Sequence, residues 1–146
     1  MRDFAMLSWR YAPAPGATYE CAAVRNSTGQ LRALSIVRRP KGESDPRLKG
    51  IKVATVSDLL FPVDAPDAGL AALIGAEEIA RRMGADAILC STTTPAITAL
   101  LPRRAYVRLP GNVHLMIRDP KAAAGLELKA ESWWITRGDA GSDEVF

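Results

Sequence analysis

Apolar residues recur with two periods along the chain, and these periods predict a sheet interrupted by helices. The runs 19–26 (YECAAVRN) and 31–39 (LRALSIVRR) are rich in strand-forming residues and enclose a Ser-Thr-Gly turn at 27–29, which predicts a β-hairpin. A third run, 51–62 (IKVATVSDLLFP), predicts a central strand. The polar stretch 40–50 has no apolar period and contains two prolines and two glycines, so we expect an exposed loop there.

Helical spacing begins after the third run. Apolar residues from about 69 to 83 approximate the period of a helix with a charged outer side, and Gly84 suits its C-terminal cap. The run 86–92 (DAILCST) predicts a short strand directly afterwards. A second helix is expected over 95–104, with Thr94 as its N-cap and a proline in the favoured first turn.

Less regular patterns flank these elements. We expect two closing strands at 105–110 (AYVRLP) and 113–119 (VHLMIRD), around a Pro-Gly-Asn turn. The opening residues 2–19 hold three aromatics followed by two prolines and a glycine, which predicts a packed arm that ends in an irregular turn and is not an obvious helix. Beyond Pro120, the pair of tryptophans at 133–134 implies that part of the tail packs back on the body, or forms an interface with a partner.

The order of elements predicts the fold class. A parallel pair of strands joined by a helix, at 51–91, is flanked by antiparallel hairpins, so the sheet should be mixed, of α+β (or α/β) type. With 146 residues, of which 48% are hydrophobic, the chain can bury one sizeable core. We expect one domain over 1–120 and a tail over 121–146 that packs on it.

Composition narrows the classes of function. The net charge of +3 comes from dispersed basic residues, which argues against a nucleic-acid partner. No apolar run approaches the roughly 18 residues that span a bilayer, and the first residues lack a secretory core, so no membrane association is expected. Cys21 and Cys90 lie in apolar runs, which indicates inert thiols in a reducing, cytoplasmic setting. One histidine and two distant cysteines predict no metal site.

Several short stretches carry a resemblance to a known family. They are WRYAPAP at 9–15, SDLLFP at 57–62, RRMGADAILCST at 81–92, AYVRLP at 105–110, VHLMIR at 113–118 and ESWWITRGD at 131–139. In their order these stretches resemble the second half of the GNAT superfamily of acyl-CoA N-acyltransferases. The resemblance implies a GNAT-like sheet in which a central strand splays from its neighbour, with acetyl-CoA or another acyl-CoA between them. It also implies transfer of the acetyl group to an amine acceptor, with the pyrophosphate on the turn before the following helix.

The chain departs from that family in three ways. The family's first strand and two helices, which shape the acceptor pocket, find no room in residues 1–12. The phosphate turn retains only Gly69, and Asp64 and Asp67 would repel a pyrophosphate unless they point away. Leu101 stands where many members have a catalytic tyrosine. The alternative is therefore a non-catalytic GNAT-like binding or assembly module. In either case we expect a homodimer, or a partner chain that supplies the missing elements.

The resemblance also directs attention to particular residues. Asp58, near the splay, could take the proton of an attacking amine, or could merely steady the end of its strand. Tyr106 could protonate the leaving thiolate, or could be a core aromatic. The residues assigned to acyl-CoA are Leu59, Leu60 and Phe61 on the strand, Val63, Ala68, Gly69 and Leu70 in the turn, and Thr93 beyond the next strand.

Two further polar features have competing interpretations. The hydroxyls at 92–94 could meet the pantetheine arm or the acceptor, and the alternative is that they cap the next helix. His114, the single histidine, falls beside Leu115 on an expected strand, which favours a packed or edge residue over a catalytic base.

Overall fold

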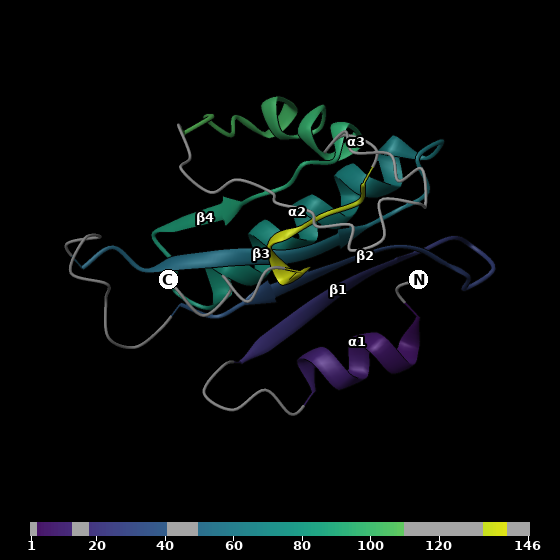
Figure 1. Ribbon diagram of the computed structural model, residues 1–146, viewed down its shortest axis with the longest axis horizontal. Coiled ribbons are helices and arrows are strands. Elements are labelled where there is room, and N and C mark those ends of the chain that lie inside the picture. The colour runs from purple at the N-terminus through teal and green to yellow at the C-terminus, as the bar shows by residue number, and fades with distance from the viewer. Residues whose placement is uncertain (1–2, 13–17, 41–49, 110–132, 140–146) are drawn as a thin grey trace, which may run out of the picture.

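The structure is a computed structural model that describes residues 3–12, 18–40, 50–109 and 133–139. Its elements in chain order are α1 (Phe4–Tyr11), β1 (Tyr19–Arg25), β2 (Leu31–Arg38), β3 (Val53–Leu60), α2 (Pro66–Arg82), β4 (Ala87–Cys90), α3 (Pro95–Thr98), and the 3-10 turns η2 (Leu101–Arg104) and η4 (Arg137–Asp139) (Figure 1).

The four strands form one sheet in the order β1-β2-β3-β4. The pairs β1–β2 and β2–β3 are antiparallel, and β3–β4 is parallel, with α2 as the crossover between them. The expected mixed α+β sheet and its N-terminal hairpin are confirmed. In the hairpin turn, the side-chain oxygen of Asn26 accepts the backbone N–H groups of Thr28 and Gln30, and Gly29 supplies a φ of 82°.

The helix α2 covers one face of the sheet, which we call the α2 face. Its buried residues recur at helical spacing and pack with β2 and β3 in one core: Ala72, Leu73, Ala76, Ile79 and Ala80 from α2, Ala33 and Val37 from β2, and Val56 and Leu59 from β3. Gly84, with a φ of 69°, follows the helix end, so the predicted helix and its glycine cap are confirmed. The helix begins slightly earlier than expected, because Pro66 takes the favourable first-turn position.

A β-bulge in β3 decides which face Asp58 occupies. Val37 pairs with Val56 and Ile36 pairs with Asp58, so Ser57 is an extra residue on β3. Residues directly opposite each other project to the same face of a sheet, so Asp58 lies with Ile36 on the face opposite α2. Without the extra residue, simple alternation would put Asp58 on the α2 face beside Val56.

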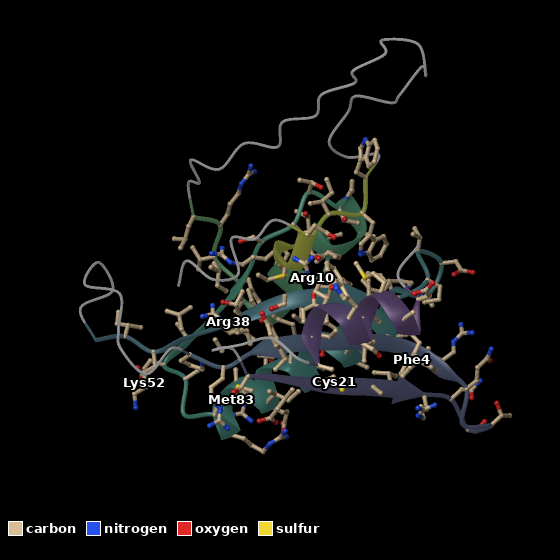
Figure 2. The ribbon with its side chains drawn as sticks, turned by 60° about the horizontal axis from the view of Figure 1, so that its bottom comes forward. Phe4, Arg10, Cys21, Arg38, Lys52 and Met83 are labelled. Atoms are coloured by element: carbon tan, nitrogen blue, oxygen red, sulfur yellow. The ribbon has the colours of Figure 1, made fainter. Side chains whose placement is uncertain are left out.

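The opposite face carries α1, and we call it the α1 face. Figure 2 shows α1 in front of the sheet, above Cys21 of β1. The expectation of a non-helical arm at 2–19 is wrong over Phe4–Tyr11. Asp3 caps the helix by accepting the N–H of Met6 at 2.9 Å, and alanine, methionine and leucine in the following turn favour helix. No residue of α1 is buried, and Phe4 and Trp9 are 86% and 74% exposed.

The region after β4 also differs from expectation. The second helix begins at Pro95 as predicted but ends at Thr98, and the chain continues in a 3-10 turn that contains Pro102. Ala105 has a φ of 58°, which reverses the backbone, and residues 105–109 form no strand. The strand expected at 105–110 is therefore wrong over its described part. The expected loop at 41–49, the strand at 113–119 with His114, and the domain boundary at 120 lie outside the described residues.

Candidate functional site

The strands β3 and β4 separate at the bulge. Their parallel pairing runs from Val53–Ala87 to Val56–Cys90 and ends there, whereas β3 continues to Leu60. Beyond the last pair, Thr92 forms an isolated antiparallel bridge with Thr136 of the tail. In Figure 1 this tail segment is yellow and crosses in front of β3. Residues 133–139, which we call the tail segment, therefore lie at the point where the two strands diverge.

Backbone and side-chain hydrogen bonds hold the tail segment on both strands. On the β4 side, the Thr93 N–H and the Thr92 hydroxyl donate to the Ile135 carbonyl at 3.2 and 2.9 Å. On the β3 side, the Trp134 indole donates to the Leu59 carbonyl at 3.2 Å. The Trp134 ring also packs edge-on against Phe61, with 5.3 Å between ring centroids. These bonds fix the segment across the gap between the strands.

The tail segment brings a hydroxyl to Asp58, and α1 brings a second one. The carboxylate of Asp58 is 1% exposed. Its Oδ1 accepts from the Thr136 hydroxyl and its Oδ2 from the Tyr11 hydroxyl, both at 2.5 Å. A Cβ on Gly138 would lie 2.2 Å from the Tyr11 oxygen, so only glycine leaves room for this contact. We call Tyr11, Asp58, Thr136 and Gly138 the Asp58 cluster.

Other polar groups, most of them buried, lie on the α1 face and in or beside the tail segment. Arg38 and Thr55 pair across β2 and β3 on the α1 face, and both are buried. Arg137, also buried, donates to the Ser91 hydroxyl at 3.4 Å, and Asp139 accepts the Thr136 N–H at 2.9 Å. Burial of charged groups is costly unless they are paired, and such groups concentrate at functional sites. The α1 face near the divergence is therefore the candidate functional site.

The turn before α2 was assigned to a pyrophosphate. Its N-cap is Ala65, which makes no side-chain cap. Asp67 points outward, with a side chain 92% exposed and 3.8 Å from Arg103. A Cβ on Gly69 would lie 2.7 Å from the Phe61 ring, so the absence of a side chain at Gly69 leaves room for that ring. The turn thus combines a helix start that has no side-chain cap with a glycine that the packing of Phe61 requires.

The residues assigned to acyl-CoA have varied surroundings. Leu59 and Phe61 are buried, and the Leu59 carbonyl is bonded to Trp134. The Thr93 hydroxyl donates to the Trp133 carbonyl at 3.3 Å. The others are Leu60, Ala68 and Leu70, which are half-buried, and Val63, which is exposed. Both Thr93 and the Leu59 carbonyl therefore form hydrogen bonds with the tail segment in this structure. Thr94 stands at the start of α3 without a side-chain cap, and its hydroxyl also turns to Trp133.

Tyr106 lies in a different environment from Asp58. It packs against the core of the α2 face, where burial and the neighbouring Glu77 raise the pKa of its phenol. Among the described residues its buried hydroxyl has no hydrogen-bond partner. Burial likewise raises the pKa of the nearby Cys90 thiol to about 12. The structure thus brings Tyr11, rather than Tyr106, to Asp58. No spacing in the sequence marked Tyr11 for this role.

The described residues contain neither a metal-binding cluster nor a helix that could span a membrane. Over the ranges that the structure describes, no three His, Cys, Asp or Glu side chains gather closely enough to hold a metal ion. In the same ranges, no helix has both the length and the apolar character needed to cross a membrane.

Comparison with known proteins yields likeness in structure only. No protein-family model matches the chain, and no curated protein matches its sequence. A mutant of the BH1408 protein from Bacillus halodurans superposes with a TM-score of 0.55 at 14% identity, covering 78% of this chain and 72% of that one. A protein from Pyrococcus furiosus, provisionally described as an acetyl transferase, gives 0.49 at 22% identity, covering 70% of this chain and 65% of its own. At these identities the likeness concerns the fold, and this chain spans about two thirds of the Pyrococcus protein.

Proposed function

We propose that the chain is a GNAT-type domain that uses acetyl-CoA or another acyl-CoA to acylate an amine. One observation carries the proposal: β3 leaves β4 at the Ser57 bulge, and the bulge turns Asp58 to the point of divergence. A gap between parallel strands, at their carboxyl ends and beside a helix start, is where α/β folds collect ligands.

The binding mode follows from the ends of the same two elements. The pantetheine arm would run along β3 at Leu59–Phe61, and the pyrophosphate would meet the uncapped start of α2. The outward direction of Asp67 reduces the repulsion expected from the sequence, because an exposed carboxylate is screened by solvent. The amine would attack the thioester carbonyl, and Asp58 would receive its proton.

A second candidate is a non-catalytic binding or assembly module with the same fold. Two observations favour it. Trp134 of the tail segment donates a hydrogen bond to the Leu59 carbonyl, and both oxygens of Asp58 accept hydrogen bonds from protein hydroxyls. In that case the buried carboxylate joins α1 and the tail segment to the sheet, and no chemistry follows.

Ligand binding and turnover separate the two candidates. Calorimetry and thermal shift with coenzyme A and acetyl-CoA should show binding and stabilisation. Release of the coenzyme A thiol with a panel of primary amines, such as spermidine, lysine and peptides with free N-termini, should show turnover. Asp58→Asn should keep the affinity for acetyl-CoA and abolish turnover. Absence of stabilisation at millimolar ligand would rule out the acyl-CoA proposal, and unchanged turnover in Asp58→Asn would remove Asp58 from the mechanism.

A homodimer or a partner chain remains part of the proposal. Within the described residues, β1 pairs only with β2 and leaves its outer edge open. Sheet edges of this kind favour pairing with another strand, although Glu20 and the bulge at Val24 and Arg25 reduce that tendency. Light scattering at micromolar concentration should give a dimer, and a monomer would count against self-association.

A further inference from the structure

Asp58 cannot meet a substrate directly. Its carboxylate is 1% exposed, and each oxygen accepts a hydrogen bond from a hydroxyl at 2.5 Å. Each of these two hydroxyls offers a path by which a proton from outside can reach the carboxylate. Thr136 is itself buried, at 5% exposure, whereas Tyr11 is half-buried. Tyr11 is thus the donor closer to solvent.

The surroundings of Tyr11 hold its hydroxyl in place. The Tyr11 ring packs edge-on against Tyr19 of β1, with 4.9 Å between centroids. Its oxygen lies where Gly138 has no side chain. No residue of α1 is buried, but Tyr11 contacts Tyr19 of β1 and Asp58 of β3, so its side chain links this helix to the sheet. The Tyr19 ring packs against the Tyr11 ring, and the missing side chain at Gly138 leaves room for the Tyr11 oxygen. Together these two contacts fix the orientation of the Tyr11 hydroxyl.

From this geometry we infer that Tyr11 is a catalytic residue that relays protons between the substrate and Asp58. The inference rests on the proposed function and extends it. As the amine nitrogen bonds to the thioester carbonyl, Tyr11 Oη takes a proton from that nitrogen and passes its own proton to Asp58 Oδ2. The C–S bond then breaks, and the proton returns from Asp58 through Tyr11 to the leaving sulfur. The products are the amide and the free coenzyme A thiol, so no other reactant is needed.

The test compares Tyr11→Phe with a control in the same helix, Trp9→Phe, because the Trp9 side chain is 74% exposed. General acid–base catalysis contributes about 10²–10⁴-fold, so Tyr11→Phe should lower kcat by at least about 100-fold with little change in the KM for acetyl-CoA. It should also flatten the pH dependence of kcat, which a merely structural role would not do. Trp9→Phe should keep both the kcat and its pH dependence. Retention of wild-type kcat and pH profile by Tyr11→Phe would overturn the relay.

A second variant keeps the hydroxyl but moves it. Gly138→Ala places a Cβ against Tyr11 Oη and should lower kcat as Tyr11→Phe does, with no further loss in the double variant. Additive losses would contradict a shared path. The outcomes also separate this inference from the proposed function. If wild type neither binds coenzyme A nor turns over, both are wrong. If wild type binds coenzyme A without turnover, acyl transfer and the relay are both wrong, and the non-catalytic binding module is supported. If wild type turns over and Tyr11→Phe retains its full activity, the relay alone is wrong.

Discussion

Gly69→Ala distinguishes a phosphate-binding glycine from a packing glycine. The new Cβ would lie 2.7–2.8 Å from three atoms of the Phe61 ring. Carbon atoms pack best at about 3.5–4.0 Å, so the ring would have to move by roughly 1 Å. Trp134 packs edge-on against the same ring, and Phe61 is 8% exposed, so the ring has little room for such a shift.

The expected magnitude follows from two opposing effects. Alanine is favoured over glycine in a helix by about 1 kcal/mol. Overpacking a filled site costs about 1–3 kcal/mol, and the blocked ring favours the upper end of that range. The net loss in the free energy of unfolding should therefore be about 2 kcal/mol, or a fall in Tm of about 4–8 °C for a chain of this size.

Thermal and urea unfolding of four proteins measure the effect: wild type, Gly69→Ala, Phe61→Ala and the double variant. In the Phe61→Ala background the clash is absent, so Gly69→Ala should stabilise by about 1 kcal/mol. Ala71→Gly, on the exposed side of α2, gives the helix propensity alone. If Gly69→Ala is neutral or stabilising in the wild-type background, the ring does not depend on this glycine, and the packing argument fails.

Three more predictions follow from burial and hydrogen bonding. Because burial raises the pKa of Cys90 to about 12 from 9.0, the folded state loses stability as the pH rises from 9 towards 12, and at pH 8 a thiol reagent should modify Cys21 alone until denaturant is added. Thr136→Val removes the hydrogen bond that the Thr136 hydroxyl donates to the buried Asp58 carboxylate and should cost about 1–3 kcal/mol by urea unfolding, whereas Thr136→Ser, which keeps the hydroxyl, should cost less. Trp134→Phe keeps an aromatic ring but loses the bond to Leu59 and should cost about 1 kcal/mol, and equal stability of this variant and the exposed control Trp9→Phe would argue against that bond.

The sequence predicts the fold well where local signals agree with packing. The hairpin has its turn residues between two β-rich runs, and α2 has both a period and a glycine end. The errors occur where local signals compete. Residues 4–11 form a helix because Asp3 caps them, although the nearby prolines and aromatics suggested an irregular arm. AYVRLP has strand-forming residues, but Ala105 takes the left-handed backbone with a φ of 58°, and residues 106–109 form no strand.

The site is less predictable, because it depends on pairing between distant segments. Asp58 was recognised from its place near the end of a strand. Its face depends on the Ser57 bulge, which follows from the register with β2 and leaves no mark in the sequence. The partners of Asp58 are 47 and 78 residues away along the chain. Contacts of that kind arise from the tertiary fold, and no local period reports them.

The span of those contacts also orders the events of synthesis. Strands β1 to β4 and α2 lie between residues 19 and 90, so the sheet can assemble while later residues are still in the ribosome. Thr136 and Gly138 leave the ribosome last among the described segments, and only then can the Asp58 carboxylate be covered. A nascent chain would thus leave the Asp58 carboxylate incompletely covered until the tail segment has left the ribosome. A stalled chain would keep this part of β3 accessible to chaperones and proteases.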